Sequence, residues 1–279
     1  MTRIMRGWRI PLICSMDLQL VGRRAIVSGS TAGIGLATAR LLAAEGARVV
    51  VNGRTAARVE EAVGAIVDAV AGADVRGVAA DLGTAAGCET LIREVPEADI
   101  LVNNVGIFAP QDFGDISDAD WFRFFEVNVL SGVRLSRHYM KGMRTRDWGR
   151  IVFVSSESAV QIPVEMIHYG MTKTAQLSIA RGLAETLSGT GVTVNSVLPG
   201  PTASEGVGTF VQQLADARGI DFAAMEREFF STARPSSLLQ RFATSDEVAS
   251  MIVYLCSARA SATTGAALRV DGGVVRAIL

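Results

Sequence analysis

A tyrosine and a lysine stand four residues apart, at Tyr169 and Lys173, in a chain where both residue types are scarce. The 279 residues include three tyrosines, and only two of the 27 basic residues are lysines. Side chains four apart in a helix share a face, so the spacing predicts that the phenol and the ammonium lie close together. Because composition favours such a pair so little, we interpret it as a candidate acid–base site.

The lysine predicts a change in the acidity of the tyrosine. A free tyrosine has a pKa of about 10, too high for efficient proton transfer at neutral pH. At about 6 Å and an effective dielectric constant of about 20, Coulomb's law gives roughly 3 kcal/mol in favour of the phenolate, or about two pKa units. We therefore expect Tyr169 to give a proton in one direction of a reaction and take one in the other.

A glycine-rich stretch covers residues 28–35, in the order Ser-Gly-Ser-Thr-Ala-Gly-Ile-Gly. It follows an apolar run and opens a helical pattern. Gly29 permits a tight turn, while Gly33 and Gly35 let the backbone approach a pyrophosphate at the positive end of the helix. The pattern favours a dinucleotide site over an ordinary glycine-rich turn.

The end of the second apolar run bears on which dinucleotide binds. An NAD site carries an acid there for the ribose 2′-hydroxyl, whereas this chain has Gly53 followed by Arg54. A guanidinium binds a 2′-phosphate that a carboxylate would repel. We predict NADP(H) as the preferred cofactor, with NAD(H) as an alternative; the competing interpretation makes Arg54 a solvated loop residue.

These residues must be positioned by an alternation of short apolar segments and longer helical patterns. Val- and Ile-rich runs of this kind are typical of parallel strands covered on both faces. The predicted strands are 24–28, 48–52, 75–80, 100–104, 150–155, 193–197 and 267–270. The predicted helices are 33–45, 56–71, 84–94, 118–145, 164–188 and 245–258. The alternation predicts an α/β domain built on a doubly wound parallel sheet of about seven strands.

The stretch 203–240 interrupts this alternation after a strand. It predicts short helices near 206–218 and 222–231, placed to cover a ligand as a lid over residues 17–279, the predicted catalytic domain. Its apolar side chains could line a pocket, although such faces more often serve a core. They are Phe210, Val211, Leu214, Phe222, Met225, Phe229 and Phe230.

The remaining features exclude several classes of protein. With 49% hydrophobic residues, the chain is too apolar to be intrinsically disordered. Its formal charge of −1 gives no net positive charge that would attract nucleic acid or an anionic membrane surface. No apolar run is long enough for a membrane span. The three dispersed cysteines predict a reducing, cytoplasmic compartment, and neither they nor the two histidines form a metal site. We expect residues 1–16 to be a flexible extension, with Met16 as an alternative start.

Taken together, the motifs resemble the short-chain dehydrogenase/reductase family over essentially all of residues 18–275. The glycine loop is similar to the family's TGxxxGxG pattern, with Ser28 in place of Thr. Further matches follow in family order, with Val105 and Thr172 as small departures. They are Asp81-Leu82, Asn103-Asn104-Val105-Gly106, Asn128, Ser156, Tyr169-x3-Lys173, Pro199-Gly200 and Val270-Asp271-Gly272-Gly273.

The resemblance implies a Rossmann-like fold and a catalytic tetrad of Asn128, Ser156, Tyr169 and Lys173. In it, Ser156 holds the substrate oxygen beside Tyr169, the general acid and base, and Asn128 holds a water that links Lys173 to solvent. Ser156 and Tyr169 are separated by a segment whose polar residues we interpret as solvated loop positions, with contact to the substrate as the alternative. These residues are Glu157, Ser158, Gln161 and Glu165. His168 should point about 100° away from Tyr169 and is not assigned to catalysis, although it could border the substrate pocket.

The resemblance also implies which positions line the cofactor. Asp81 and Leu82 would border the adenine, Asn103 and Gly106 the cleft, and the backbone of Thr202 the carboxamide. The predicted cofactor-binding residues are Gly29, Ser30, Thr31, Gly33, Ile34, Gly35, Arg54, Asp81, Leu82, Asn103, Gly106, Tyr169, Lys173, Pro199, Gly200, Thr202 and Ser204. Asp271, Gly272 and Gly273 fit a carboxy-terminal turn and subunit packing better than chemistry.

The expected activity is hydride transfer between NADP(H) and a ketone or secondary alcohol. The expected partners are a small-molecule carbonyl or alcohol substrate and further copies of the chain in a homodimer or homotetramer, with no nucleic acid and no membrane. One alternative is a reductase of 3-oxoacyl thioesters, and another is a non-catalytic nucleotide-sensing protein of the same fold. The insertion has few basic residues to guide the phosphate of a carrier protein, and sensors commonly lose the Tyr or Lys that this chain retains.

Overall fold

Seven parallel strands form the central sheet of the computed structural model, which describes residues 16–204, 208, 215 and 218–278. The order across the sheet is β3-β2-β1-β4-β5-β6-β9, and every neighbouring pair is parallel. The strands are β1 (Arg24–Val27), β2 (Arg48–Gly53), β3 (Val75–Ala79), β4 (Ile100–Asn103), β5 (Gly149–Val154), β6 (Val192–Pro199) and β9 (Ala267–Val270). The predicted doubly wound sheet is confirmed, with all seven strands in place.

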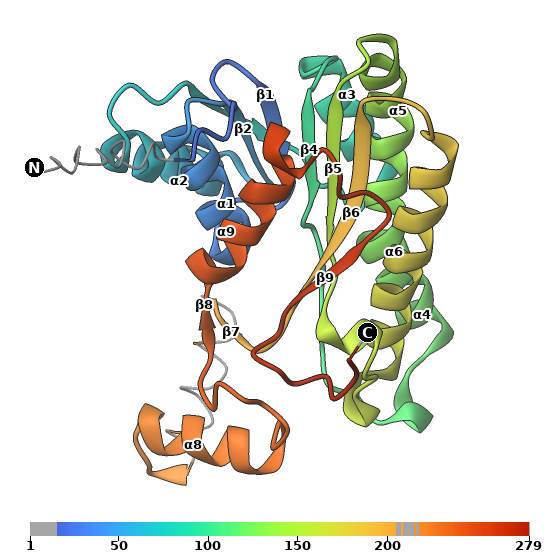
Figure 1. Cartoon of the computed structure of the whole chain (residues 1–279). Helices are drawn as coiled ribbons and strands as arrows, with labels where there is room; N and C mark the ends of the chain where they lie inside the picture. The colour runs from blue at the N-terminus through green and yellow to red at the C-terminus, as the bar shows by residue number, and fades with distance from the viewer. Residues whose placement is uncertain (1–15, 205–207, 209–214, 216–217, 279) are drawn as a thin grey trace, which may run out of the picture.

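Helices cover both faces of this sheet (Figure 1). One face packs against α1 (Gly33–Ala44), α2 (Ala56–Ala69) and α9 (Ser245–Cys256). The other packs against α3 (Ala85–Glu94), α5 (Ser131–Thr145) and α6 (Ile167–Thr186), with α4 (Asp118–Phe125) against α6. The two layers explain why the strands are apolar on both faces.

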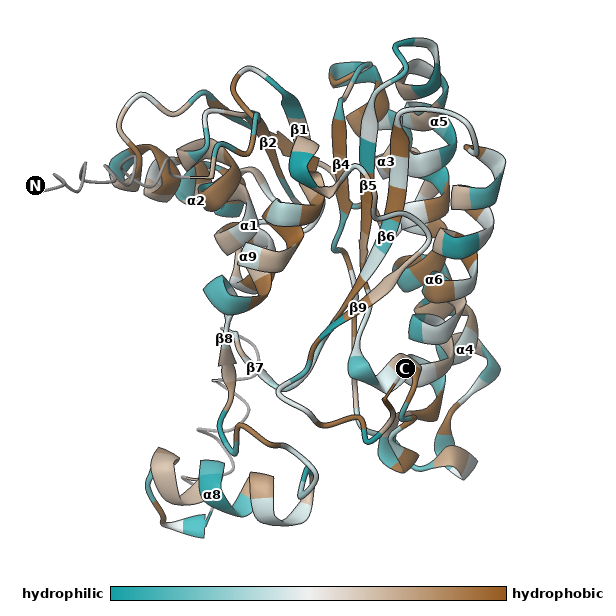
Figure 2. Ribbon diagram, in the orientation of Figure 1, coloured by the Kyte–Doolittle hydropathy of each residue, from teal (hydrophilic) through white to brown (hydrophobic). Residues whose placement is uncertain are grey.

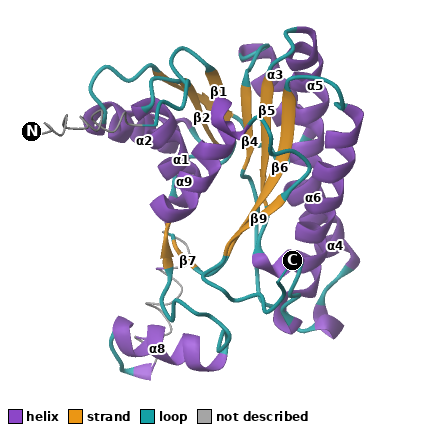
Figure 3. Ribbon diagram, viewed as in Figure 1, coloured by secondary structure: helices purple, strands orange, loops and turns teal. Residues whose placement is uncertain are grey.

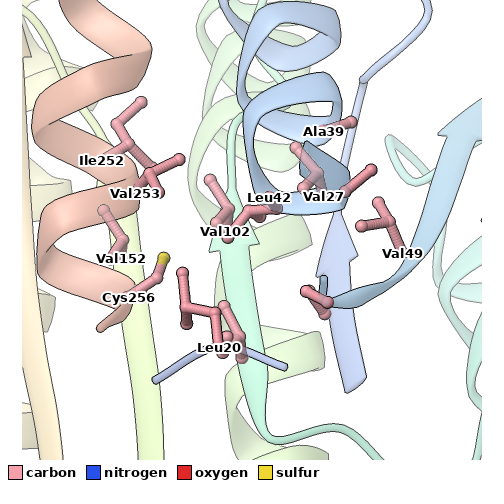
Figure 4. Packing of buried hydrophobic residues seen from close by; sticks show 14 of the residues in the cluster. Leu20, Val27, Ala39, Leu42, Val49, Val102, Val152, Ile252, Val253 and Cys256 are labelled. Atoms are coloured by element: carbon pink, nitrogen blue, oxygen red, sulfur yellow. The ribbon is translucent and has the colours of Figure 1, made fainter. Parts of the chain in front are cut away.

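The alternation of side chains along each strand divides the interior into two hydrophobic clusters. On β5, Val152 and Val154 join the cluster under α1 and α9, whereas Ile151 and Phe153 join the cluster under α5 and α6. Figure 4 shows the first cluster, in which Val152 faces Cys256 and Ile252 of α9. Figure 2 shows hydrophobic residues along β4 and β5, between the helix layers.

The helix predicted over 118–145 contains a change of helical geometry. Residues Glu126–Leu130 form a turn of π-helix between α4 and α5. The helical stretch begins at a capping box, in which Ser117 Oγ accepts from the Asp120 N–H and the Asp120 carboxylate accepts from Ser117. Single π turns inside helices often mark functional sites, and Asn128 lies at the centre of this one.

The insertion begins and ends at a second, two-stranded sheet. Strand β7 (Thr202–Ala203) pairs in parallel with β8 (Ala243–Thr244), and α8 (Phe222–Thr232) lies between them in the chain. Figure 3 shows α8 beyond the carboxyl ends of the central strands. Met225 and Phe230 are buried against Phe242 in a small local core, so these two lid side chains serve packing.

Other predictions fall on segments outside the described residues. These are the extension up to residue 15, most of the helix expected near 206–218, and the side chains of Phe210, Val211 and Leu214. Within the described residues, no helix combines the length and apolarity needed to cross a bilayer. No group of three His, Cys, Asp or Glu side chains in that same part of the chain is arranged to hold a metal ion.

Candidate active site

The site lies where the strand order reverses. The chain runs outward from β1 through β2 to β3 and then returns to β4 on the other side of β1, so the segments after β1 and β4 diverge and leave a crevice. Gly29 follows β1 and Asn104 follows β4, and these two segments are hydrogen-bonded to each other. The predicted glycine loop therefore occupies the switch point at which doubly wound sheets bind nucleotides.

Asn104 holds the glycine loop in its turn. Its Nδ2 donates to the carbonyl oxygens of Ser28 at 3.1 Å and Gly29 at 2.9 Å, and its main-chain N–H donates to Ser28 Oγ at 2.8 Å. Gly29 and Gly33 have φ values of +59° and +54°, which other residues rarely adopt. A Cβ on Gly35 would lie 2.4 Å from the Gly29 carbonyl oxygen, so the loop also needs a glycine there.

The other side of the loop is tied to the neighbouring strands. The Ser30 N–H donates to the Asn52 carbonyl at 2.8 Å, and the Asn52 N–H returns a hydrogen bond to Ser30 Oγ at 2.9 Å. The buried Asn52 amide then donates to the carbonyls of Val78 and Ala80. These hydrogen bonds make the loop a rigid cradle joined to β2 and the end of β3.

The cradle has the features that a bound pyrophosphate needs. Helix α1 begins after Ala32 with no side-chain cap and no acid in its first turn, so its leading N–H groups keep their capacity for an anion. A Cβ on Gly33 would lie 3.1 Å from Ser204 Cβ, so the segment after β7 closes over the loop. Thr31 and Ile34, both half-buried, complete the predicted phosphate side of the site.

The adenosine side carries a cation and an acid at adjacent strand ends. Arg54 is exposed at the end of β2 and, among the described residues, has no hydrogen-bond or ion-pair partner. Asp81 is exposed after β3, and its Oδ1 accepts from the Gly83 N–H at 3.0 Å. Leu82 is 2% exposed and packs in the second cluster, so only its backbone can face an adenine.

Asn103 does not line the cleft with its side chain. Its amide is buried and donates to Ser136 Oγ of α5 at 3.1 Å, because successive residues of a strand point to opposite faces. The neighbouring Asn104 takes the position on the cleft side. Gly106 does border the site, since a Cβ there would lie 3.4 Å from Lys173 Nζ.

The segment after β6 forms the opposite wall. Thr202 is buried, and its hydroxyl donates to the Gly200 carbonyl at 2.9 Å, which leaves its backbone to face the crevice. A Cβ on Gly200 would lie 2.6 Å from the Asp271 carbonyl oxygen, so Pro199 and Gly200 pack closely on the carboxy-terminal turn. Asp271 caps that turn by accepting from the N–H groups of Gly273 and Val275.

The four predicted catalytic residues come from three elements that meet beside this crevice. Ser156 follows β5, Tyr169 and Lys173 lie on α6, and Asn128 lies on the π turn. Contacts join α6 both to the π turn and to the short turn Glu157–Ala159 after β5. The fold therefore brings all four residues together.

Lys173 and Tyr169 share a face of α6, as their spacing predicts. Lys173 Nζ lies 5.6 Å from the centre of the Tyr169 ring and donates to the Val154 carbonyl at 2.9 Å. Burial lowers the pKa of Lys173 to about 8. Burial also raises the pKa of Tyr169 above its usual value, the interaction with the Ser156 side chain opposes this, and the charge of Glu157 adds to it.

The pKa of Tyr169 is raised, whereas the sequence predicts that Lys173 lowers it. Lysine alone was expected to favour the phenolate, but the burial of the phenol outweighs any such effect and favours the protonated form. A tyrosine that keeps its proton is suited to act as an acid. Positive charge added beside it would be needed for the reverse role.

Asn128 links the π turn to both neighbouring segments. Its Oδ1 accepts from the Ile107 N–H at 2.7 Å, while its Nδ2 donates to the Ile107 carbonyl and to Thr172 Oγ1, each at 3.0 Å. Gln176 Nε2 donates to the main-chain carbonyl of Asn128. That carbonyl still has a second lone pair, so the relay water implied by the family remains a prediction.

Ser156 makes its shortest contact with the next residue along the chain. Its hydroxyl donates to Glu157 Oε2 at 2.5 Å, and the Ser158 N–H donates to both Ser156 Oγ and Glu157 Oε2. Glu157 and Ser158 are 5% and 2% exposed, so the interpretation of these two as solvated loop residues is wrong. Gln161 is exposed and Glu165 half-buried, closer to that expectation.

A distant arginine compensates the buried acid. Arg234, which follows α8, places Nε 3.3 Å from Glu157 Oε1 and Nη1 3.5 Å from Glu165 Oε1. The hydroxyl of Ser155, the residue before Ser156, donates to the main-chain carbonyl of Lys173 at 2.9 Å. The two serines therefore support different parts of the site.

His168 lies away from the crevice, and the idea that it borders the substrate pocket is wrong. It is fully buried, with its ring 4.0 Å from that of Phe124 and 6.0 Å from that of Trp121 between centroids. Burial lowers its pKa, which Asp120 partly opposes. A neutral imidazole in an aromatic cluster fits a packing role.

Sequence reasoning missed three contributors to the site. Asn104 was quoted in a motif without a role, although strand alternation could have placed it on the cleft side. Gln176, three residues after Lys173, shares its helical face and could have been found by the same spacing argument. Arg234 gave no signal, because only the folded chain brings it to Glu157.

Comparison with known proteins places these features in context. Residues 29–275 match a family model described as enoyl-(acyl carrier protein) reductase. An uncharacterized oxidoreductase of Bacillus subtilis, YvaG, is 47% identical over 94% of this chain and all of its own length. A D-beta-hydroxybutyrate dehydrogenase of Cupriavidus necator is 34% identical, with 92% of this chain and 99% of that protein covered.

Solved structures share the fold of this chain. L-sorbose reductase from Gluconobacter frateurii, solved with NADPH and L-sorbose, is 32% identical and superposes with a TM-score of 0.88. That likeness covers 94% of this chain and all of the other. A structure described as a short chain dehydrogenase/reductase family protein is 38% identical, with a TM-score of 0.80 over 91% of this chain and 98% of its own.

Proposed function

Because this chain belongs to the short-chain dehydrogenase/reductase family of NAD(P)-dependent oxidoreductases, we propose that it transfers hydride between NADP(H) and a ketone or secondary alcohol. The observation that carries the proposal is the meeting of Tyr169, Lys173 and Ser156 beside the glycine cradle. Lys173 Nζ lies 5.6 Å from the Tyr169 ring, and the Ser156 side chain opposes the rise in the pKa of the same phenol.

The residues divide the reaction between proton transfer and positioning. In reduction, Tyr169 gives its proton to the carbonyl oxygen as negative charge develops there, and its raised pKa keeps that proton available. In oxidation, its phenolate takes the proton of the alcohol, and the Lys173 ammonium favours that form. Ser156 holds the substrate oxygen in line with Tyr169. When bound, the nicotinamide supplies or accepts the hydride.

The cofactor-binding residues fit an NADP molecule. The uncapped start of α1 suits a pyrophosphate, and Arg54 at the end of β2 suits a 2′-phosphate. The bound NADPH of the sorbose reductase supports the same choice for this chain. We take residues 17–279 as the catalytic unit, with the insertion near 203–240 on its substrate side.

The substrate side favours a small polar molecule. Glu157, Glu165 and Arg234 meet next to Ser156, and such groups suit hydroxyl or carboxylate substituents. Among the relatives, one reduces L-sorbose and another oxidises D-beta-hydroxybutyrate, both small polar compounds by name. We therefore propose a hydroxylated ketone or a short oxo acid, or the matching alcohol, as the substrate.

A turnover assay tests the proposal. Purified protein should oxidise NADPH with a member of a carbonyl panel that includes L-sorbose and acetoacetate. Tyr169→Phe should lower turnover by roughly 10³-fold while leaving NADPH affinity nearly unchanged. Tyr254→Phe, on α9, is the matched control and should keep full activity. Full turnover by Tyr169→Phe on an authentic substrate would refute the mechanism.

Reduction of 3-oxoacyl thioesters is the second candidate, because a 3-oxoacyl-[acyl-carrier-protein] reductase of Aquifex aeolicus is 30% identical over 93% of this chain. The insertion argues against it. Two of its arginines and the adjoining Arg241 are paired with acids, so Arg227 is the one arginine in the described part of the insertion without an acid partner, which leaves little basic surface for an acidic carrier. The pairs are Arg218–Glu228, Arg234–Glu157 and Arg241–Glu247. Higher kcat/KM with an acetoacetyl thioester than with simple ketones would reverse this order.

Other expectations stay predictions. A non-catalytic nucleotide sensor would bind NADPH without turnover, so the same panel separates it from an enzyme. We expect a homodimer or homotetramer and a cytoplasmic location.

A further inference from the structure

A buried charged pair next to the catalytic serine has no part in the mechanism described so far. Glu157 is 5% exposed, and the side chain of Arg234 is 13% exposed. Burying a carboxylate is costly unless it is paired and hydrogen-bonded, and this one is both. Each Glu157 oxygen has a separate partner: Oε2 accepts from Ser156 and Ser158, and Oε1 faces Arg234.

The contact with Ser156 decides where that hydroxyl points. A serine hydroxyl has one hydrogen to donate, and a carboxylate at 2.5 Å is a stronger acceptor than a neutral oxygen. The Ser158 N–H donates to Ser156 Oγ at 3.1 Å and so fixes the oxygen from a second direction. The serine is therefore held in one orientation before any substrate arrives, with its hydrogen on Glu157 and one lone pair left to accept from a hydroxyl such as that of Tyr169 or of an alcohol substrate.

We propose that Glu157, clamped by Arg234, is a positioning residue that orients the Ser156 hydroxyl and brings a negative charge to the site that Ser156 and Tyr169 form. This inference rests on the proposed function, since it concerns the same reaction. In this role Glu157 acts through Ser156 and Tyr169. Its charge favours the protonated tyrosine, and with it the acid needed to reduce a carbonyl.

Among the residues that the structure describes, few other charges act on this tyrosine from the elements around it. Strand β6 and the loop 104–111 carry no ionisable side chain, and His168 turns toward Trp121 and Phe124. Glu165 lies on the outer side of Arg234. The charged groups that face the Ser156–Tyr169 pair are Lys173 on α6, Glu157, and Arg234 with Glu165 behind it.

Removing the two charges separately should move the pH dependence in opposite directions. Alcohol oxidation with NADP rises with pH as Tyr169 loses its proton. Glu157→Gln removes negative charge, so the midpoint of this rise should shift to lower pH, and the freed serine should lower kcat roughly 10-fold. Arg234→Gln leaves Glu157 uncompensated, so the midpoint should shift to higher pH.

Glu165→Gln is the matched control, because it removes the other carboxylate that contacts Arg234 and leaves the Ser156 contact intact. Its midpoint should move less than that of Glu157→Gln. Glu157→Asp keeps the charge but withdraws it from Ser156, so kcat should fall while the midpoint stays close to wild type. NADPH titration and thermal unfolding establish that each variant is folded.

The outcomes separate the two proposals. If the wild-type protein turns over no carbonyl or alcohol, the proposed function fails. If wild type is active but Glu157→Gln keeps its midpoint, or moves in the same direction as Arg234→Gln, the role of Glu157 is refuted. Should Glu157→Gln not fold, Arg234→Gln decides alone, since an unchanged midpoint there contradicts the inference.

Because the chain has so few tyrosines, the ionisation of Tyr169 can also be measured directly, without a substrate. The chain has three tyrosines, so the ultraviolet difference between wild type and Tyr169→Phe reports the phenolate of Tyr169 in the NADP complex. The same opposite shifts should appear in that titration. A merely structural role for Glu157 would lower stability without moving this signal.

Discussion

Gln176 Nε2 donates a hydrogen bond of 2.5 Å to the main-chain carbonyl oxygen of Asn128. The same side chain places Oε1 3.5 Å from Lys173 Nζ. One buried amide thus joins the π turn to the catalytic lysine, and it does so from α6, the helix that also carries Tyr169.

Gln176→Met should uncouple these groups while nearly preserving side-chain volume. We expect a loss of about 1–3 kcal/mol in the free energy of unfolding, because the Asn128 carbonyl loses its buried donor. We expect kcat to fall roughly 10-fold through misplacement of Lys173. Chemical denaturation and steady-state kinetics measure the two effects. Ser178→Ala, at an exposed position of the same helix, should change neither, and equal losses in both variants would contradict the prediction.

The pKa of Lys173 predicts how stability depends on pH. Burial lowers this pKa from 10.5 to about 8, so between those values the unfolded chain binds a proton that the folded chain has released. The free energy of unfolding should therefore rise with pH across this window. The burial penalty is about 3 kcal/mol at pH 7 and falls to about 1 kcal/mol near pH 9.5.

Lys173→Met should flatten this dependence. The variant should exceed wild type in stability at neutral pH, and the difference should narrow as the pH rises through 8. Urea unfolding of both proteins at several pH values measures it. A constant difference across the range would show that Lys173 does not titrate there.

Two helical glycines offer a matched pair of substitutions. In Gly35→Ala the new Cβ would meet the Gly29 carbonyl at 2.4 Å and Asn104 Nδ2 at 2.6 Å, so the cradle must shift. We expect NADPH affinity to fall at least roughly 10-fold, because the N–H groups of the loop no longer converge. In Gly64→Ala on α2 the Cβ meets nothing within 4 Å. That variant should gain about 0.5–1 kcal/mol of stability and bind NADPH normally.

Fluorescence titration with NADPH and thermal unfolding compare these variants. If both alanines weaken NADPH binding equally, the close approach of backbone segments at Gly35 is not what shapes the site.

Arg54 predicts the choice of cofactor. Arg54→Ala should lower kcat/KM for NADPH roughly 10- to 100-fold, the loss expected for one charged hydrogen bond, and leave kcat/KM for NADH nearly unchanged. Arg58→Ala removes a similar exposed charge from the first turn of α2 and serves as the control. A loss that is equal for both cofactors would assign Arg54 a general role in folding.

The fold could be predicted from the sequence because its signals are local. Runs such as Val49-Val50-Val51 need burial on both faces, and β2 supplies it. The Tyr169–Lys173 pairing was equally local, since four residues of helix determine it. The π turn at Asn128 was not predictable, because apolar periodicity does not distinguish it from an α-helical turn.

The electrostatics of the site depended on contacts distant in sequence. Glu157 looks like a solvated loop residue until Arg234, 77 positions away, is placed beside it. The acidity of Tyr169 could not be derived from Lys173 alone, because its burial depends on the segments packed around it. Spacing therefore identified the chemical groups, and tertiary packing determined their ionisation.

The pairing of β7 with β8 has a consequence for how this chain can be altered. Thr202 pairs with Ala243 and Ala203 with Thr244, and the Ala243 N–H also donates to the Pro201 carbonyl at 2.9 Å. The two ends of the insertion are thus held side by side by the pairing of β7 with β8. Each doubling of the length of such a loop adds only about 0.6 kcal/mol to the entropic cost of closing it. The segment between β7 and β8 can therefore be exchanged. Replacing it with the matching segment of a relative can change substrate preference while the nucleotide cradle stays intact.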